Sequence, residues 1–598
     1  MREGQQSNII KQSTTERMME SFLILVGLVN LILAVKGYNQ KPIYHLTPED
    51  GHWINDPNGL FYDPIHGKYH VFAQYNPNAP YWGDMSWTHW ISDDMVTWKK
   101  LSTALINDQT YDIGGAFSGS AIRIGENETP VLVYTCVEAD GKESQCYAIS
   151  ADASDPEQEK YKKADANPVL SYSDLPAGSN PSNFRDPTLW RGTCGNNTWT
   201  MAVAAEINGV GNILNYDCDI GISPEIFNCK LLNSLWKSDN ENAAYKTYMV
   251  ECPDFYKIGP NPFASGKLWV LKYSIMEERR EVYELGRYDD TAGVFNRDTE
   301  HFPLFLEYDY GPNDHFYASK RFDDAISHEQ ILFGWSNEHD DQYTTRNWAG
   351  VLTMPRKVQF NTELNILRFL PFDKLELLHE TTIPTLSLPE PIYFDKNHNY
   401  LTIIPNEEQP KRSIQLFPTE ISSLTTEIRF QFNVTLDITG ADCNCLEDIE
   451  IGVYGRQSAD GQHYIKHGVG IKRYLKNYDD KNDSYLYSII DTNQASGTTP
   501  KLFYQRNFPN YNQDHINYIF THDNGKQRNI VIDFQLFYDH SIIELFLRQG
   551  DMVSTLRVYP DEADNGFSLY AINPCDNDQI IVQDLQSWNM RTIWNDLN

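Results

Sequence analysis

The sequence predicts an all-β protein, and three observations support this prediction. Aromatic residues make up 13% of the 598 residues, with 36 Tyr and 28 Phe, and such side chains favour pleated, half-buried surfaces. Helical periodicity is nearly absent after residue 40. Short apolar runs, such as Tyr69–Tyr75, Val131–Tyr134 and Lys267–Tyr273, are instead separated by Gly, Asn, Asp and Pro, which is typical of strands joined by turns.

Length and a change of pattern predict two domains. A single core seldom grows beyond roughly 250–300 residues, and this chain is much longer. The prolines between about Leu370 and Tyr393 suggest a boundary there, and later strands such as Glu427–Thr435 alternate like strands of a sandwich with one wet face. We expect a signal segment at 1–37, a first domain at 42–370, a linker at 371–393 and a β-sandwich at 394–598.

The N-terminus predicts export. Arg2, Lys11 and Arg17 precede the apolar run Phe22–Val35, whose fourteen residues are too few to span a bilayer, which needs roughly 20. They fit a signal peptide cut after Gly37, behind a polar extension, and we expect a secreted, extracellular protein. An uncleaved anchor or a buried helix remains an alternative. Four glycosylation sequons agree with export, at Asn127, Asn196, Asn433 and Asn482.

Charge and cysteines narrow the function classes. The net charge of −33 disfavours nucleic acids and anionic membrane surfaces as partners, whereas a neutral sugar experiences no such repulsion. The nine cysteines show no zinc-binding spacing, so we expect no metal and no cofactor. Candidate disulfides are Cys136/Cys146 and Cys218/Cys229, and the odd count leaves a free thiol, for which Cys252 is the candidate.

Three acidic residues lie in distinctive local settings. Asp56 and Asp186 each precede a proline, which favours an extended backbone at the acid, and Asn58-Gly59 adds a turn after the first. Glu251 is followed by Cys-Pro. Taken singly, these strings are also typical of a surface turn, a solvated Arg-Asp pair and a surface glutamate.

Together, the strings Asp-Pro-Asn-Gly, Arg-Asp-Pro and Glu-Cys resemble, in this order, the signature set of the glycoside hydrolase family 32 invertases and fructan hydrolases. The resemblance covers residues 42–598. Three further strings look like the sugar pocket of that family: Gln74-Tyr-Asn-Pro77, Trp82-Gly83 and Trp87-Thr-His89. Phe117-Ser-Gly-Ser120 follows another family pattern, and Trp588-Asn-Met590 resembles the last strand of the family's second domain. Strings that resemble later blade motifs are Asp309-Tyr-Gly311, Phe316-Tyr-Ala-Ser319, Trp348-Ala-Gly350 and Pro355-Arg356.

The resemblance implies a five-bladed β-propeller followed by a C-terminal β-sandwich, although no repeat period is visible in the sequence itself. It implies that Asp56 is the nucleophile, that Glu251 is the general acid and then the base, and that Asp186 stabilises the transition state. This is a retaining mechanism, in which the two reacting carboxyls stand about 5 Å apart. The residues implied to hold the fructose ring, of which the aromatic ones are also typical of packing, are Trp53, Asn55, Gln74, Trp82, Phe117, Ser118 and Arg185.

These roles need different pKa values. Asp56 must be ionised while Glu251 is protonated, and like charges held close raise one of the two pKa values. Because Arg185 adjoins Asp186, we expect it to keep Asp186 ionised and to leave Glu251 with the highest pKa. An acidic optimum, roughly pH 4–6, follows from this order.

The substrate remains open at this point. In similar plant proteins, an Asp followed three residues later by Lys is associated with sucrose use, whereas this chain has Asp289 and Ala292. We expect a β-fructofuranosidase acting on sucrose or related fructosides. Alternatives are a fructan exohydrolase or inulinase, a fructosyltransferase, a related arabinoside or xyloside hydrolase, and an inactive sugar-binding protein. The sandwich is a candidate for sugar binding or for assembly of a homo-oligomer, but it supplies no defined site.

Overall fold

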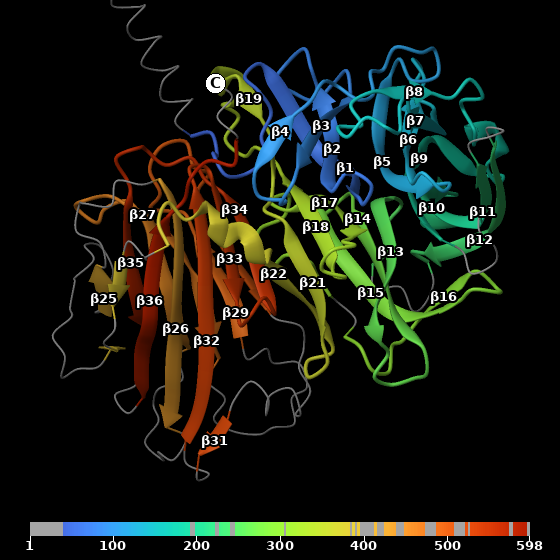
Figure 1. Ribbon diagram of the computed structural model, residues 1–598. Coiled ribbons are helices and arrows are strands. Elements are labelled where there is room, and N and C mark those ends of the chain that lie inside the picture. The colour runs from blue at the N-terminus through green and yellow to red at the C-terminus, as the bar shows by residue number, and fades with distance from the viewer. Residues whose placement is uncertain are drawn as a thin grey trace, which may run out of the picture.

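The computed structural model describes residues 40–191, 198–221, 226–239, 245–303, 306–382, 386–388, 391–394, 412–415, 424–437, 448–472, 486–507, 521–523, 527–572 and 578–594. Strands dominate these ranges, so the all-β prediction is confirmed (Figure 1). The helical pieces described there are short: η1 Tyr172–Asp174, α2 Tyr343–Arg346 and η2 Asp373–Leu378. Within the described ranges, no helix has both the length and the apolar character needed to cross a bilayer. The predicted signal segment lies outside them.

The first domain contains five antiparallel sheets that follow one another along the chain. Blade 1 has β1 His52–Asp63, β2 Lys68–Asn76, β3 Ser86–Ser92 and β4 Trp98–Lys100, and blade 2 has β5 Gly115–Ile124, β6 Thr129–Val137, β7 Glu143–Ser150 and β8 Tyr161–Lys163. Blade 3 has β9 Ser179–Arg191, β10 Thr198–Ile207, β11 Val210–Gly221 and β12 Ile226–Lys237, and blade 4 has β13 Val250–Pro260, β14 Lys267–Ile275, β15 Arg280–Asp289 and β16 Val294–Arg297. Blade 5 has β17 Tyr317–Asp323, β18 Gln330–Ser336, β20 Val351–Leu352, β21 Arg356–Asn361 and β22 Ile366–Pro371.

The first strands of the blades form a ring. Strand β1 packs beside β5, β5 beside β9, β9 beside β13, β13 beside β17, and β17 beside β1. The short strand β19 (Trp348–Ala349), which belongs to the last part of this domain, pairs in parallel with β1 and closes the circle. The five-bladed propeller is therefore confirmed, and each blade contributes its first strand to the centre. Radial repetition of this kind leaves few free sheet edges.

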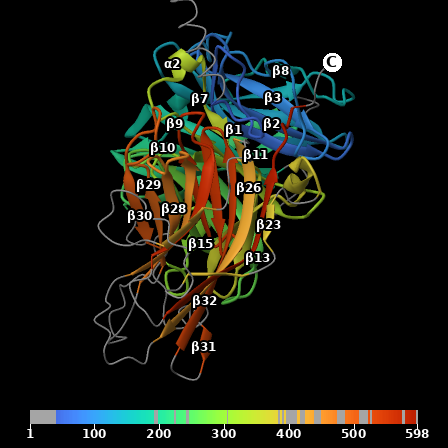
Figure 2. The ribbon, with the colours of Figure 1, turned by 90° about the vertical axis from the view of Figure 1, so that its left-hand side faces the viewer.

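The second domain is a two-sheet sandwich (Figures 1 and 2). One sheet contains β23 Leu386–Leu388, β24 Ile392–Tyr393, β26 Thr425–Asp437, β31 Thr521–Asp523, β32 Gln527–Asp539, β33 Ile542–Leu547, β34 Met552–Arg557 and β36 Gln579–Asn589. The other contains β25 Arg412–Gln415, β27 Ile449–Gln457, β28 Ile465–Ile471, β29 Leu486–Asp491, β30 Phe503–Asn507 and β35 Gly566–Ile572. On β26, Phe430, Phe432 and Val434 are buried while the residues between them are half-buried, which is the alternation that the sequence predicts.

The interval 371–393, predicted as a linker, contributes two strands to the sandwich. Its two strands, β23 and β24, both pair with β36, so this portion adds to the edge of a sandwich sheet. The 3-10 helix η2 precedes them. The sequence predicted a boundary here from its prolines, but the pairing strand β36 lies about 190–200 residues further along and gave no local signal.

Buried charges join the propeller to the sandwich, and we call this group the interdomain cluster. Arg356 Nε donates to Glu544 Oε2 at 3.0 Å, and Arg356 Nη1 donates to Asp309 Oδ2 at 3.0 Å. His45 lies between Asp539, 2.8 Å from its Nδ1, and Glu544, 3.0 Å from its Nε2. All five side chains are almost fully excluded from water. Together, they tie the N-terminal segment and the last blade to strands β32 and β33.

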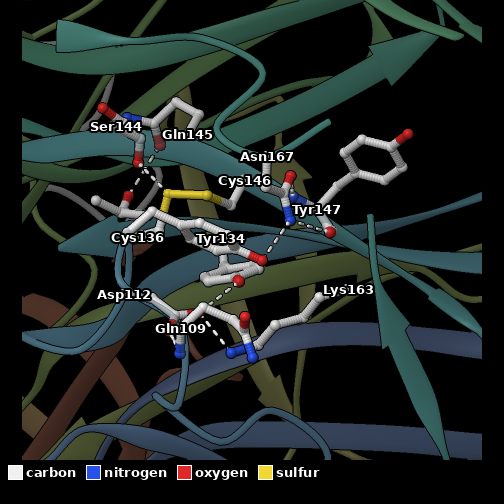
Figure 3. Close-up of a disulfide and its surroundings, with 12 residues drawn as sticks. Gln109, Asp112, Tyr134, Cys136, Ser144, Gln145, Cys146, Tyr147, Lys163 and Asn167 are labelled. Atoms are coloured by element: carbon white, nitrogen blue, oxygen red, sulfur yellow. Dashed lines mark hydrogen bonds and ion pairs between the residues drawn. A yellow bond between two sulfur atoms is a disulfide. The ribbon is translucent and has the colours of Figure 1, made fainter. Parts of the chain in front are cut away.

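Both predicted disulfides form. Cys136 on β6 is bonded to Cys146 on β7, next to the hydrogen bond from Tyr134 to Asp112 (Figure 3). Cys218 on β11 is bonded to Cys229 on β12. Among the described cysteines, Cys252 is the free one, and it is buried.

Candidate active site

The candidate catalytic residues meet at one level of the inner ring. Asp56 comes from β1, Asp186 from β9 and Glu251 from β13, and we call these three the carboxylate cluster. Every inner strand has an irregular register at this level, namely between Ile54 and Pro57, Ala116 and Gly119, Arg185 and Thr188, Glu251 and Asp254, and Tyr317 and Lys320. Such bulges bend a strand and redirect side chains, and here they release the acids from the regular ladder.

Asp56 accepts hydrogen bonds from three strands. Asn55 Nδ2 donates to Oδ1 at 2.9 Å, while Ser118 Oγ at 2.6 Å and Gln74 Nε2 at 3.3 Å donate to Oδ2. The Cys252 thiol lies 3.5 Å from the same Oδ2. Burial raises the pKa of Asp56, and the bonds from Ser118 and Asn55 oppose that rise. The carboxylate is thus fixed in direction by donors that favour its ionised form.

The Asp-Pro-Asn-Gly string lies inside β1 and is not a surface turn. Asn58 Oδ1 accepts a bond from Gly119 N at 3.0 Å, which joins blade 1 to blade 2 immediately below the acid. Gly59 has φ +55°, and a Cβ atom there would stand 2.9 Å from Phe72. The motif therefore needs glycine for its conformation and for close packing.

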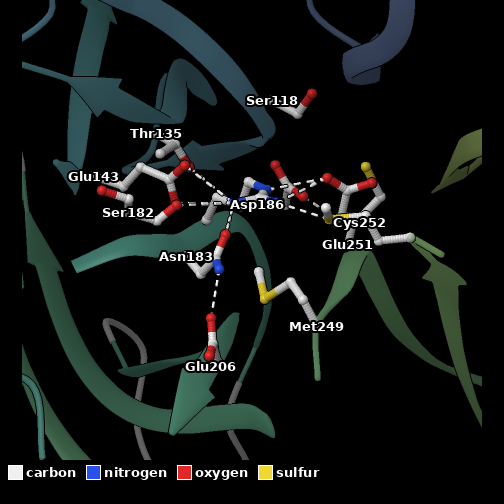
Figure 4. Close-up of polar contacts among 12 residues, drawn as sticks. Ser118, Thr135, Glu143, Ser182, Asn183, Asp186, Glu206, Met249, Glu251 and Cys252 are labelled. Carbon is white, nitrogen blue, oxygen red and sulfur yellow. Dashed lines mark hydrogen bonds and ion pairs between the residues drawn. The ribbon is translucent and has the colours of Figure 1, made fainter. Parts of the chain in front are cut away.

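Asp186 has an unusual backbone as well as a buried carboxyl. Its φ is +66°, and that of Cys252, whose N–H donates to Asp186 Oδ2 at 2.8 Å, is +46°. The N–H of Asp186 donates to Thr135 Oγ1 at 2.9 Å (Figure 4). Left-handed backbone at residues other than glycine is strained, and it persists here because neighbouring strands hold both residues. Burial raises the pKa of Asp186 to about 6, with Arg185 acting in the opposite direction.

Glu251 accepts hydrogen bonds from one cationic donor and one neutral donor. Arg185 Nη2 donates to Oε1 at 2.9 Å, and the Tyr317 hydroxyl donates to Oε2 at 2.6 Å. Burial alone would raise the pKa of Glu251, but Arg185, Tyr317 and Arg279 outweigh it and hold the pKa below its usual range. The prediction that Glu251 has the highest pKa of the three acids is therefore wrong. Arg185 pairs with Glu251 rather than with its sequence neighbour Asp186.

The predicted sugar-contact residues divide into two groups. Trp53 is buried, and its Nε1 donates to Asn55 Oδ1 at 2.9 Å, so it positions the amide that holds Asp56. Trp82 is 56% exposed and meets the half-buried Phe117 edge-on, with ring centroids 5.7 Å apart, so both are accessible to a ligand.

The string Trp87-Thr-His89, interpreted as part of the sugar pocket, lies elsewhere. Trp87 is fully buried and donates its Nε1 to Phe117 O, and His89 is fully buried against His70. Both lie in the packing of blades 1 and 2. Their strand is buried on both faces, so polar atoms in the string did not indicate exposure.

The pair used to judge sucrose use also lies away from the carboxylate cluster. Asp289 and Ala292 lie at the turn between β15 and β16, the outer strands of blade 4, where Asp289 Oδ1 accepts from the Ala292 N–H at 3.0 Å. Besides Arg185, the basic side chain near Glu251 is Arg279, from the turn between β14 and β15, whose Nη1 lies 3.9 Å from Glu251 Oε2. Because Ala292 lies at this outer turn, it is not a guide to the sugar that the carboxylate cluster accepts.

Sequence reasoning missed Tyr317, Arg279 and Glu143. Tyr317 and Arg279 stack, with the guanidinium 4.9 Å from the ring centre, and both face Glu251. On its other side, Arg185 donates a hydrogen bond to Glu143. Tyr317 lies in Phe316-Tyr-Ala-Ser319, which resembles a blade motif of the family, so the sequence offered a signal for it. Glu143 follows an ordinary turn and Arg279 lies in one, so the sequence offered no signal for either.

Comparison with known proteins agrees with this architecture. The model of the "Glycosyl hydrolases family 32 N-terminal domain" matches residues 45–371, and that of the family 32 C-terminal domain matches 410–589. A fructan 6-exohydrolase of Triticum aestivum is 30% identical over 93% of this chain and 90% of its own length. An acid beta-fructofuranosidase of Rosa hybrid cultivar is 28% identical over 92% of this chain and 81% of its own.

Solved structures show the same fold. Fructan 1-exohydrolase IIa from Cichorium intybus superposes with a TM-score of 0.70, at 23% identity over 93% of this chain and 98% of that one. The Bombyx mori beta-fructofuranosidase gives 0.62, at 23% identity over 97% and 99%. Since family models match both domains and full-length relatives align along nearly the whole chain, this protein belongs to glycoside hydrolase family 32.

Proposed function

We propose that this glycoside hydrolase removes the terminal non-reducing β-D-fructofuranosyl unit from sucrose or a related fructoside, with retention of configuration. The observation that supports this best is the carboxylate cluster itself. One acid, Asp56, is surrounded by neutral donors, while another, Glu251, is held by a cation and a phenol. Two carboxyls in different environments are what an acid and a nucleophile require. The names of relatives point to fructosides as the substrate class.

In the first step, an Asp56 oxygen attacks the anomeric carbon of fructose. The bond to the leaving oxygen breaks, and that oxygen takes the proton of Glu251. In the second step, Glu251 accepts a proton from water, the water oxygen attacks the same carbon, and Asp56 is released. Asp186 stabilises the positive charge on the ring through bonds to fructose hydroxyls, and the charge is larger in the transition state than in the substrate.

The pKa directions of Asp56 and Glu251 both oppose the ionic form that catalysis needs. Catalysis needs Asp56 ionised and Glu251 protonated, whereas burial raises the pKa of Asp56 and Arg185 helps to lower that of Glu251. The protonated fraction of Glu251 therefore falls early as pH rises, and the coupled acids titrate together. We expect an acidic optimum, roughly pH 4–6, and an optimum near neutrality would contradict it.

Substrate and acceptor are tested by product analysis. Wild type and Glu251→Ala are incubated at about pH 5 with sucrose, inulin, levan and a short fructo-oligosaccharide. Fastest release of fructose from sucrose indicates an invertase, release from the polymers only indicates a fructan exohydrolase, and new oligosaccharides indicate a transferase. Equal and negligible release by both proteins contradicts the proposed function and favours an inactive sugar-binding protein. Release from an arabinan contradicts the fructoside assignment.

Export is part of the proposal. Two disulfides in the propeller are typical of proteins from an oxidising compartment, and Asn127, in a predicted sequon, is exposed. Expression in a secreting eukaryotic cell is expected to give a glycosylated protein in the medium whose N-terminus follows Gly37. Retention of the whole protein in the cell would contradict export.

Assembly of a homo-oligomer through the sandwich is a separate part of the proposal. Light scattering of the purified protein tests it, and a monomeric mass would contradict it.

A further inference from the structure

Arg185 lies between two carboxylates. Its Nη1 donates to Glu143 Oε1 at 3.0 Å and Oε2 at 3.2 Å, while its Nη2 and Nε donate to Glu251 Oε1 at 2.9 and 3.2 Å. Glu143 begins β7, the third strand of blade 2, and is 4% exposed. It also accepts the N–H of Phe184 at 2.6 Å, so it fixes the backbone that carries Arg185. Figure 4 shows Glu143 and Glu251 on opposite sides of Asp186, the neighbour of Arg185.

We propose that Glu143 is a positioning residue that competes with Glu251 for Arg185 and thereby sets how readily Glu251 holds its proton. The inference rests on the proposed role of Glu251 as the catalytic acid. One guanidinium cannot fully neutralise two buried carboxylates, and an unpaired buried charge is costly, so the pair binds one proton more readily than either acid alone. When Glu143 is ionised, it forms the ion pair with Arg185, and the proton shared by the two glutamates lies on Glu251.

The groups around Glu143 support this competition. The charged groups facing it are Arg185 and Asp186 from β9 and, across the guanidinium, Glu251 from β13. Burial raises the pKa of Glu143 to about 7, and Arg185 only partly opposes that rise. Around Glu251 the charged groups are Arg185, Arg279 and the two acids Asp56 and Asp186. Two carboxyls on one guanidinium titrate as a unit, and the catalytic microstate has the proton on Glu251.

Neutralising Glu143 should therefore weaken the acid selectively. In Glu143→Gln the whole charge of Arg185 acts on Glu251, whose pKa falls further. The loss grows as pH rises toward neutrality, because Glu143, whose pKa is raised to about 7, becomes ionised there in the wild type but cannot ionise in the variant. Each unit by which the pKa of Glu251 falls lowers its protonated fraction about tenfold on the neutral side.

The test compares two substrates. Sucrose has a poor leaving group that needs a proton, whereas the leaving group of p-nitrophenyl β-D-fructofuranoside needs little help. For Glu143→Gln we expect kcat/KM for sucrose to fall about tenfold near pH 7 and little near pH 5. We expect kcat/KM for the aryl fructoside to change less than about threefold, and one limb of the sucrose pH profile to move to lower pH. Glu143→Asp, which keeps the charge, should restore part of the sucrose activity.

The matched control is Glu206→Gln. Glu206 on β10 accepts from Asn183 at 2.6 Å, and Asn183 Oδ1 accepts from Arg185, so this change perturbs the same surroundings without removing a charge from Arg185 (Figure 4). Its pH profile should match that of the wild type. Equal losses of both substrates in Glu143→Gln at every pH, or an unmoved profile, would overturn the inference even when Glu251→Ala is inactive on sucrose. A fully active Glu251→Ala would instead overturn the proposed function beneath it.

Discussion

Two buried groups of carboxylates in this protein each have arginine as a partner, but they differ in how cations and carboxylates are matched. In the interdomain cluster, arginine and histidine lie directly between carboxylates, and the pKa of Asp539 falls to about 2 because bonds from His45 and His540 outweigh burial. In the carboxylate cluster, Arg185 serves two glutamates, and burial raises the pKa of both Asp56 and Asp186.

The difference separates a structural role from a chemical one. Where cations outweigh burial, as at Asp539 and Glu544, the pKa falls, and the ionised carboxylates hold two domains together. Carboxylates that share too few cations exchange protons near that range, as catalysis needs. The comparison predicts that mutations in the first group act on stability, while those in the second act on rate.

The largest effect is expected for Asp56→Asn. Because the attacking oxygen is lost, kcat should fall by more than about 10⁴-fold. Stability should stay the same or rise, since a buried carboxyl whose ionisation burial disfavours is removed. Steady-state kinetics and urea unfolding measure the two effects. Asp289→Asn, at the outer edge of blade 4, is the matched control and should leave kcat unchanged. A strongly destabilised but active Asp56→Asn would give Asp56 the structural role assigned to the interdomain cluster, and would contradict its role in catalysis.

The next effect concerns stability. Arg356→Met leaves Glu544 and Asp309 without their cation, which should lower the free energy of unfolding by about 3–5 kcal/mol. Urea denaturation measures it, and kcat per folded molecule should be unchanged. In the control Lys68→Met, the lost partner is the exposed Asp93, and the change should stay below about 1 kcal/mol. Similar losses in the two variants would show that burial of the pair is unimportant.

A smaller effect is the pH dependence of stability at His45. Burial alone would lower its pKa, but hydrogen bonds to Asp539 and Glu544 outweigh it and raise the pKa above 6.5. A raised folded-state pKa gives stability that is fully present below about pH 6.5 and is lost as pH rises through the folded value. His45→Gln should lack this alkaline decline, as urea midpoints between about pH 6 and pH 9 will reveal. An unchanged decline would assign it to another group.

The smallest effect is expected at the exposed aromatic pair. Trp82→Ala removes an exposed ring that meets Phe117 edge-on, so KM should rise about 3- to 10-fold with kcat nearly constant. The matched control is Tyr81→Ala, whose side chain is similarly exposed, and it should leave KM unchanged. A large fall of kcat in Trp82→Ala would instead connect this ring to the reacting groups.

Local patterns allowed much of this to be predicted. The turn-rich apolar runs gave the all-β class, alternation in Glu427–Thr435 matched β26, and the disulfide pairs are neighbours on adjacent strands. The three acids were identified through the resemblance of their strings to the family 32 signature, and the structure adds the unusual backbone at Asp186, whose φ is positive.

The errors concerned partners that only the closed ring brings together. Arg185 was assigned to Asp186 next to it, but its carboxylates come from β7 and β13, 42 and 66 residues away. That distant pairing reversed the predicted pKa order. Ala292 was given a role by its spacing from Asp289, yet the turn lies at the rim of a blade. Sequence spacing does not distinguish inner from outer strands, because both are short apolar runs.

The central claim, that Asp56 is the nucleophile, is tested most directly by trapping the intermediate. Glu251→Ala lacks the base for the second step, so it should accumulate a fructosyl-enzyme from p-nitrophenyl β-D-fructofuranoside. After rapid acid quench and peptide mass analysis, the account predicts one added anhydrofructose on the peptide that contains Asp56, with a burst of one nitrophenolate per site. An adduct on Asp186, or turnover without any adduct or burst, would contradict it.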